Sequence, residues 1–526
     1  MAAAAVSALV ALAAWALSSP VGATPDEDFH LASTWCGLGE RADACAPGSS
    51  EATREVPREI LLATCFAFRA DVSASCQASV VDPDELVETK RGNFTGLYPP
   101  VFFAVTSAFV GDDVNRSVLV MRMFNASLFV LLVGAVVLLS PAGLRRAVLV
   151  GAVVTSVPFT VFLVPSINPS GWAFLSAVTL LVSVVGYLTT RGRRRWALGA
   201  LSVVATTVGA GARADAAVYA IIAIAIAMFL TVRRERAWWL AAVLPVALAL
   251  ASAVSYLTAG QNNATENVGD PLTLQRLWDL LLGIPHLWVG TMGLWGLGWL
   301  DTALPPVVWA VNWGLYVAVV FAALVRLPRR VAWSVAGMAT AVVAIPSYVQ
   351  YASGEPVGSM IQPRYILPLL TMLAIVAVLR LDGPAFVLAP VQRWLLVAGL
   401  GVTNAVSLHA NMRRYVTGTD VATLDLDNRI EWWWGGLPIG PLATFVLGAV
   451  AFVVMLAVVT GELARPADAG ELLTRARAAV RDGSTSPDTE ADDRSAPDGG
   501  TRNDPPADLA VANGSPAGGS LSGAVA

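Results

Sequence analysis

The feature that most constrains this chain is the recurrence of long apolar runs. Runs of roughly 17–22 residues, each long enough to cross about 30 Å of hydrocarbon as a helix, occupy most of the sequence. Apolar residues make up 56% of the chain and charged residues 14%, with a mean hydropathy of +0.63. This composition predicts an all-α integral membrane protein. About twelve runs qualify as spans, near 3–22, 118–139, 147–165, 171–190, 196–212, 214–231, 238–258, 305–325, 331–350, 365–381, 394–410 and 441–460.

Arginine clusters predict the orientation of these spans. Basic residues gather in cytoplasmic loops of membrane proteins, and the clusters here follow alternate spans, which places both termini in the cytoplasm and the chain in the plasma membrane. The tail 465–526 is rich in Pro, Gly, Ser and Asp and is expected to be a disordered cytoplasmic extension. The clusters are Arg145/Arg146, Arg191/Arg193/Arg194/Arg195, Arg233/Arg234/Arg236 and Arg326/Arg329/Arg330.

The first apolar segment, 1–22, has two interpretations. The small residues Val21-Gly22-Ala23 resemble the cleavage site of a secretory signal peptide. The segment lacks a basic stretch at its start and is long for a signal peptide, which favours a retained first span.

The orientation places 23–117 outside the cell, as a loop followed by a short apolar, interfacial segment. Residues 23–97 carry thirteen Asp and Glu against six Lys and Arg, as expected of a translocated loop. The loop also contains every cysteine of the chain, which predicts two disulfides. The simplest pairing is 36–45 with 65–76, although three pairings of Cys36, Cys45, Cys65 and Cys76 are possible. A zinc site is less compatible with these spacings.

The remaining region, 118–464, is expected to be the helical domain, with external loops near 259–304, 351–364 and 411–440. The first of these has an amphipathic pattern over Pro271 to Leu282 that suits a membrane interface. The last contains Trp432-Trp433-Trp434. These tryptophans fit an interfacial aromatic belt, and they would also suit stacking on a sugar ring.

Pro25-Asp26-Glu27-Asp28-Phe29-His30 directly follows the first apolar segment and is the strongest candidate for chemistry. Three carboxylates and a histidine at the mouth of a span suit acid–base work on a substrate held in lipid. The carboxylates could also bind a divalent cation through oxygen ligands, but so few ligands favour no obligatory metal.

Cationic residues at the ends of spans are candidates for binding phosphate. Arg122 and Arg213, the latter near Asp215, lie in otherwise apolar segments, where a charge costs about 2.5–3.5 kcal/mol. Arg213 and Asp215 fit a satisfied polar turn equally well. Arg364, between Gln362 and Tyr365, has two interpretations, an interfacial anchor or a ligand of a lipid phosphate.

Four motifs in order resemble a bacterial membrane-protein family. They are Pro-Asp-Glu-x-x-His at 25–30, Tyr98-Pro99-Pro100, Asn168-Pro169-Ser170-Gly171 and Gln-x-Arg-Tyr-x-x-Pro at 362–368. The family is known as domain of unknown function 2142 and is similar in plan to integral-membrane glycosyltransferases of the C-type fold. The rich alanine, valine and arginine content suggests a GC-rich bacterium such as an actinomycete.

The resemblance implies transfer of a sugar from a polyprenyl-phosphate donor outside the membrane. It assigns Asp26 as general base, with Glu27 as its partner or substitute, His30 as orienter of the acceptor and Asp28 as a solvated residue. The donor phosphate would contact Arg364 first, then Arg213 and Arg122, aided by Gln362 and Tyr365. An acceptor groove would involve Tyr98, Pro99, Pro100 and Asn168.

The chain has no nucleotide-binding glycine motif, so an outward-facing enzyme would receive its donor through the lipid bilayer. The acceptor would be a glycan, lipid or protein of the cell envelope, and no nucleic acid is expected. Two alternatives share this topology. One is a flippase or transporter of lipid-linked glycans, and the other is a polymerase or ligase of surface polysaccharide.

Overall fold

The computed structural model describes most of the chain, and its described residues, which end at 464, belong to one compact unit. The expected disordered tail at 465–526 lies outside the described residues, as do Pro271 and Leu272 of the amphipathic pattern. The described ranges are 1–41, 43–79, 85–261, 273–325, 327–353, 361–381, 385–427 and 431–464.

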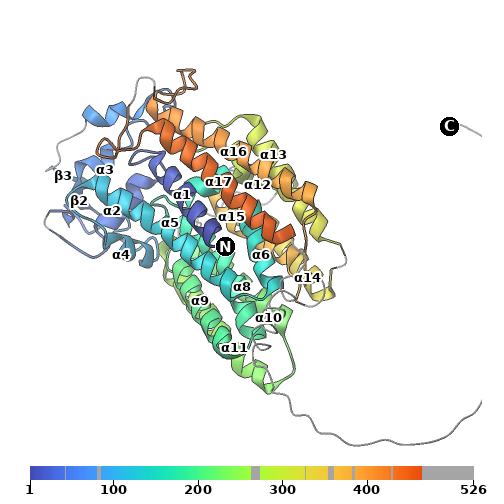
Figure 1. Ribbon diagram of the computed structural model, residues 1–526. Coiled ribbons are helices and arrows are strands. Elements are labelled where there is room, and N and C mark those ends of the chain that lie inside the picture. The colour runs from blue at the N-terminus through green and yellow to red at the C-terminus, as the bar shows by residue number, and fades with distance from the viewer. Residues whose placement is uncertain are drawn as a thin grey trace, which may run out of the picture. The chain divides into compact units, whose positions relative to one another are not determined.

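The elements before the main bundle are short, apart from the first helix. Figure 1 shows α2, α3, α4 and the small sheet together at one end of the bundle, with α1 running into it. These elements are α1 (Ala2–Leu17), α2 (Glu27–Trp35), β1 (Ala46–Pro47), β2 (Arg54–Pro57), α3 (Arg58–Leu62), η1 (Ala74–Ser79), β3 (Leu86–Thr89) and α4 (Val101–Ser107).

The bundle itself is built mainly of long apolar helices. Its elements are α5 (Val114–Leu139), α6 (Ala142–Val154), α7 (Pro158–Leu163), α8 (Pro169–Thr189), α9 (Gly192–Ala210), α10 (Ala214–Thr231), α11 (Arg236–Thr258), α12 (Leu274–Val289), η3 (Gly290–Leu294), α13 (Pro306–Ala323), α14 (Arg329–Ser353), α15 (Pro363–Val378), α16 (Pro390–Val416) and α17 (Pro441–Ala464).

Eight described helices are long and apolar enough to cross a membrane, which identifies a multi-pass membrane protein. They are α5, α8, α10, α11, α13, α14, α16 and α17. The expected number of twelve is not confirmed. The predicted first and tenth spans form apolar helices of only 16 residues, α1 and α15. The predicted third span is broken at 155–157 into α6 and α7, and the predicted fifth, α9, begins with a run of arginines.

The centre of the bundle is formed by α8 and α15. In α8, 94% of the apolar window is buried, against 28% in α5 and 22% in α11. A helix that is apolar all round packs inside a bundle rather than at its surface. Helix α15 is also buried along most of its length and contacts α6, α8 and α14, while α1 packs between α17 and α5.

The loop between α1 and α5 is cross-linked as the simplest cysteine pairing predicts. Cys36 pairs with Cys45 and Cys65 with Cys76, with Cα–Cα distances of 5.3 and 6.1 Å. The three short strands form an antiparallel sheet in the order β1-β2-β3, in which Val56 of β2 lies opposite Val87 of β3. The loop is therefore a small folded subdomain.

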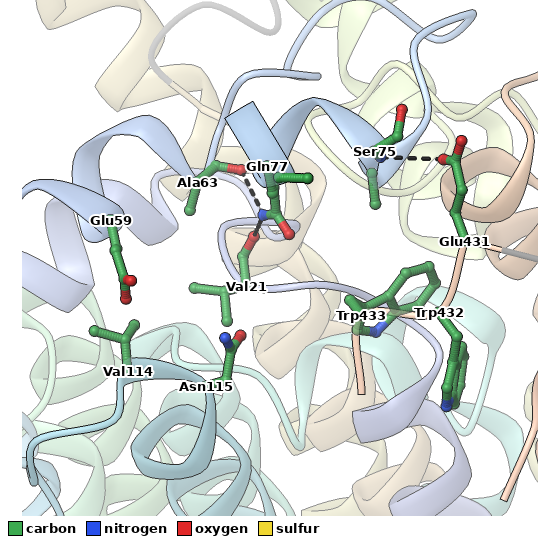
Figure 2. A pocket seen from close by; sticks show the side chains of 12 residues that line it. Val21, Glu59, Ala63, Ser75, Gln77, Val114, Asn115, Glu431, Trp432 and Trp433 are labelled. Atoms are coloured by element: carbon green, nitrogen blue, oxygen red, sulfur yellow. Dashed lines mark hydrogen bonds between the residues drawn. The ribbon is translucent and has the colours of Figure 1, made fainter. Parts of the chain in front are cut away.

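This subdomain is fastened to the bundle by polar contacts across long sequence separations. The Gln77 amide donates to the carbonyls of Val21 and Ala63, at 2.8 Å each, as Figure 2 shows. At the turn closed by Cys65–Cys76, the Phe66 carbonyl accepts from the buried Arg414 guanidinium of α16, which also donates to Asp301. Multiple contacts of this kind fix the position of the subdomain against the ends of the helices.

The expected amphipathic segment is a helix in its described part. In α12 the apolar side chains of Leu280, Ile284 and Leu287 are buried, whereas Trp278 and Leu282 are exposed. The chain then makes one π-helical turn, η3, in which Gly293 adopts a positive φ of 118°. Glycine tolerates this backbone conformation, which ends the helix before α13.

Candidate functional site

The predicted acidic motif lies at the junction between α1 and α2. Residues 18–26 connect the two helices, and Asp26 is the N-cap of α2 with a left-handed backbone, φ 58°. Aspartate adopts this conformation more readily than most residues, but the conformation still carries strain that the surroundings must hold. The Pro25 carbonyl is held at 3.0 Å by the Asn168 side-chain amide. Asn168 therefore positions the turn that presents Asp26.

The three consecutive carboxylates each contact a different principal arginine. Asp26 pairs with Arg364, Glu27 with Arg122 and Asp28 with Arg91. Their side chains are 40%, 0% and 12% exposed, in that order. Only Asp26 has substantial access to solvent. The three neighbouring carboxylates therefore lie in different environments although their chemistry is similar.

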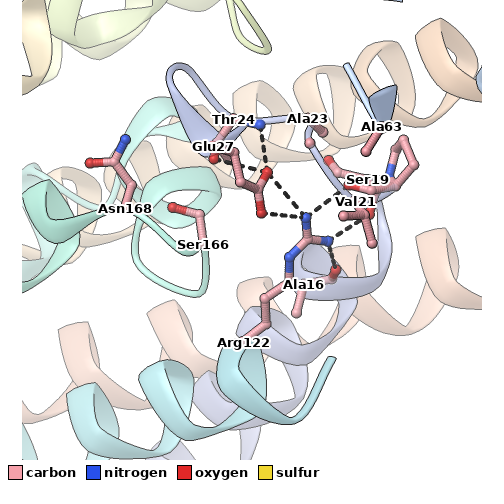
Figure 3. A network of polar contacts seen from close by, with 12 residues as sticks. Ala16, Ser19, Val21, Ala23, Thr24, Glu27, Ala63, Arg122, Ser166 and Asn168 are labelled. Carbon is pink, nitrogen blue, oxygen red and sulfur yellow. Dashed lines mark hydrogen bonds and ion pairs between the residues drawn. The ribbon is translucent and has the colours of Figure 1, made fainter. Parts of the chain in front are cut away.

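Glu27 and Arg122 form a fully buried ion pair. Their closest N–O distance is 3.0 Å, and the Thr24 backbone and hydroxyl also donate to the Glu27 carboxylate (Figure 3). Arg122 additionally donates to the carbonyls of Ala16, Ser19 and Pro20. The guanidinium that the sequence assigned to donor phosphate is thus occupied by the end of α1. The geometry gives Arg122 and Glu27 a structural role instead.

Asp28 is not solvated, which corrects the expectation from sequence. Arg91 binds it in a bidentate manner, with Nε and Nη2 at 2.5 and 2.9 Å from the two carboxylate oxygens. Arg91 also approaches Asp26, at 3.5 Å. Sequence reasoning missed Arg91, whose signal was weak: it lies beside the only lysine, shortly before the Tyr-Pro-Pro motif.

Asp26 and Arg364 combine an accessible carboxylate with a buried cation. Arg364 Nη2 lies 2.6 Å from Asp26 Oδ2, and the Arg364 side chain is only 2% exposed. Burial by itself raises the pKa of the Asp26 carboxyl, but the charges of Arg364 and Arg91 and the hydrogen bond from Arg364 outweigh burial and hold that pKa below its ordinary value. The carboxylate is therefore ionised at neutral pH.

The ring of Tyr365 lies close to two guanidinium groups. Arg213 Cζ is 4.3 Å and Arg364 Cζ 5.2 Å from the ring centroid, and Arg364 also donates to the Tyr365 hydroxyl at 3.1 Å. Arg213 is held by Asp215 through two hydrogen bonds of 2.8 and 2.9 Å. The polar turn and the cationic site therefore form one arrangement, in which two arginines lie close to the same aromatic ring.

His30 is enclosed by aromatic rings. Its ring centroid is 5.5 Å from that of Phe29, 5.6 Å from that of Tyr98 and 6.0 Å from that of Phe103, and the residue is 1% exposed. Burial lowers the pKa of His30 to about 3, with Asp26 opposing the shift. The imidazole is neutral, and its Nδ1 has no hydrogen-bond partner among the described residues.

The other residues expected at the site fall into two groups. Tyr98 and Gln362 adjoin the site: Arg213 lies over the Tyr98 ring at 5.7 Å, and the buried Gln362 Oε1 lacks a partner among the described residues. Pro99 is buried, and Pro100 is the N-cap of α4, so these prolines shape the chain entering that helix.

Metal ligation has little geometric support here. Within the described ranges no group of three His, Cys, Asp or Glu side chains is placed to hold an ion. In the segment 26–28, each carboxylate is directed at an arginine, which supplies positive charge of its own.

The fold and this site define a polytopic membrane protein with a disulfide-linked subdomain and an arginine-rich polar site where the subdomain meets the bundle. The chain belongs to the family of predicted membrane proteins with domain of unknown function 2142, whose model matches residues 9–373. That range includes Asp26, Arg213 and Arg364. No curated protein and no solved structure matches the chain significantly.

Proposed function

We propose that this protein transfers a sugar from a polyprenyl-phosphate donor to an acceptor hydroxyl at this site. The observation that supports this is the pairing of the solvent-accessible Asp26 with the buried Arg364, 2.6 Å apart. A proton acceptor and a phosphate-binding cation are then adjacent before substrate arrives, as displacement of a sugar from phosphate requires.

The phosphate-binding part consists of Arg364 and Arg213, whose guanidinium groups both lie close to the Tyr365 ring. Arg364 Nε is buried without a partner among the described residues, so it remains available as a donor. Guanidinium forks match phosphate oxygens well, and burial strengthens their attraction for an anion. An entering phosphodiester competes with Asp26 for Arg364. Once Arg364 is drawn toward phosphate, the pKa of Asp26 rises and the carboxylate becomes a better base.

The proposed reaction is a single displacement. The acceptor oxygen forms a bond to the anomeric carbon while Asp26 takes its proton, and the bond from that carbon to the phosphate oxygen breaks. Polyprenyl phosphate leaves with the electron pair, and Arg364 and Arg213 stabilise the added negative charge. A single displacement inverts the anomeric configuration of the sugar.

The neighbouring residues position this machinery. Glu27 and Arg122 hold the junction from α1 to α2, Asp28 and Arg91 hold the first turn of α2, and the neutral His30 packs beneath it. In this proposal Glu27 is not a substitute base and Arg122 does not bind phosphate, because the two side chains are paired with each other.

The proposed topology has the site outside the cell and both termini in the cytoplasm. It needs α1, α9, α15 and the pair α6–α7 to act as spans besides the eight long helices. The positive-inside distribution of arginine supports it, and a donor delivered in the outer leaflet requires it.

The test uses purified protein in liposomes with a radiolabelled polyprenyl-phosphate sugar and a cell-envelope extract as acceptor. Asp26→Asn should abolish transfer, because the amide cannot accept the proton, while insertion and folding are retained. The matched control is Asp420→Asn, at an exposed position outside the site. Normal transfer by Asp26→Asn would refute the assignment of the base. Movement of the donor across the bilayer without transfer would refute the enzyme and support a flippase.

A further inference from the structure

A separate cavity lies where the disulfide-linked subdomain meets the start of α5 and the segment before α17. Its volume is about 390 Å³. Figure 2 shows Glu59, Val114 and Asn115 on one side, with Ser75, Glu431 and the two tryptophans on the other. The side chains that line it include Glu59, Asn115, Glu431, Trp432 and Trp433.

The two tryptophans of this cavity have unpaired donors. Their ring centroids are 4.9 Å apart at 43°, and neither buried indole Nε1 has a hydrogen-bond partner among the described residues. By contrast, the Nε1 of Trp434 donates to the Leu17 carbonyl at 2.9 Å. A buried N–H without an acceptor costs about 1–3 kcal/mol. Trp432 and Trp433 therefore differ from a structural tryptophan in the same run.

The rest of the lining supplies polar groups without positive charge. Glu59 and Glu431 contribute carboxylates and Asn115 an amide, and among the described residues that line the cavity there is no lysine or arginine. Burial, aided by the charge of Asp113, raises the pKa of the Glu59 carboxyl. The Ser75 backbone N–H donates to Glu431 at 3.1 Å and so links the subdomain to the segment before α17. This chemistry disfavours phosphates and other anions and favours neutral hydroxyl-rich ligands.

We propose that this cavity binds a short neutral segment of a glycan. Aromatic rings present apolar faces to the C–H faces of sugars, and the carboxylates and the amide can bond to ring hydroxyls. Its volume lies at the small end of ligand pockets. The identification of this glycan as the acceptor substrate rests on the proposed function, whereas the proposal that the cavity binds a glycan does not.

The cavity is connected to the polar site by a firmly held segment. Val21 lines the cavity and precedes Asp26 by five residues. Between them, the Gly22 carbonyl accepts from Trp299 Nε1 at 2.8 Å and the Ala23 carbonyl from the Tyr415 hydroxyl at 3.1 Å. A glycan bound here would lie beside a firmly held segment of the chain that leads to Asp26.

The first experiment presents the full chain, in lipid nanodiscs, to an array of defined neutral oligosaccharides of mannose, galactose, arabinose, glucose and rhamnose. Anionic oligosaccharides and phospholipid vesicles are included as competing classes. Binding to at least one neutral oligosaccharide is expected. Binding to none of them, or a preference for the anionic ligands, would overturn the proposal.

Variants then locate the binding. Ala78 lines the cavity and is exposed, so Ala78→Trp fills space without removing packing and should weaken binding. Trp432→Ala removes the aromatic ring and should weaken binding by about tenfold. Trp432→Phe keeps an aromatic ring and loses only the N–H, so it should weaken binding less than Trp432→Ala. The control is Trp394→Ala, at a 56% exposed tryptophan of α16. Unchanged affinity in both Ala78→Trp and Trp432→Ala would overturn the proposal.

Binding and transfer are distinguished by Asp26→Asn. This variant should bind the oligosaccharide as the unaltered protein does. Glycan binding by the unaltered protein with no transfer to any acceptor would uphold the cavity assignment while refuting the proposed function. Ala78→Trp is also assayed for transfer to an oligosaccharide that the protein bound on the array. An unchanged KM for that acceptor would show that the cavity is not the acceptor subsite.

Discussion

Replacing Glu27 with glutamine tests whether the ion pair with Arg122 holds the junction between α1 and α2. Both side chains are buried, at 0% and 2% exposure, and glutamine keeps the size of glutamate. Breaking a buried pair by removing one charge costs about 3–5 kcal/mol, since the other charge is left uncompensated. Arg122 keeps three backbone carbonyl acceptors. We therefore expect the free energy of unfolding to fall by about 3 kcal/mol, at the lower end of this range.

The measurement is equilibrium unfolding in mixed micelles, followed by tryptophan fluorescence. The matched control is Glu85→Gln in the same subdomain, because the pair Arg58–Glu85 has side chains that are 41% and 44% exposed. Exposed pairs contribute at most about 1 kcal/mol. Equal losses for the two variants would refute the reasoning that burial of the charge determines the cost.

Further predictions concern protonation and cross-links. The pKa of His30 in the folded protein, about 3, is below its unfolded value, so its contribution to stability should be complete above the unfolded pKa and fall by about 1.4 kcal/mol per pH unit between the two values. His30→Phe should flatten this slope in unfolding measured at several pH values, and an unaltered slope would contradict the buried neutral state. The pKa of Asp26 is lowered in the folded protein, so the stability that Asp26 contributes is lost at lower pH than the contribution of His30. The loss of stability in acid that remains in His30→Phe should therefore shrink when Asp26→Asn is added. An unchanged loss would count against the pairing of Asp26 with Arg364. Replacing both Cys65 and Cys76 with serine should cost about 2–4 kcal/mol in the same assay, and stability equal to that of the unaltered protein would contradict the cross-link.

The segment 26–28 illustrates how neighbouring carboxylates acquire different roles. Asp26, Glu27 and Asp28 have similar intrinsic chemistry, and the helix turn directs them to different sides. Each reaches a principal arginine from a different segment of the chain, at 364, 122 and 91. Because only Asp26 retains solvent access, it is the one carboxylate of the three that a substrate can approach.

Several features could be predicted from local sequence alone. Apolar runs indicated a multi-pass helical protein, since span length follows from hydrocarbon thickness. The confinement of all cysteines to one loop indicated disulfides, and the shortest pairing proved right. The break at 155–157 was missed because Thr155-Ser156-Val157 carries no charge, so hydropathy continues across it although the helix does not.

Sequence by itself determined the membrane class, the cross-linked loop and the position of the acidic motif, because each depends on composition or short spacing. Tertiary structure decided which carboxylate stays accessible, which arginine adjoins it and where Arg91 belongs. Those contacts join residues 63 to 338 positions apart. Local patterns contain no information on such distances, because charge pairing at this range is set by how the helices pack.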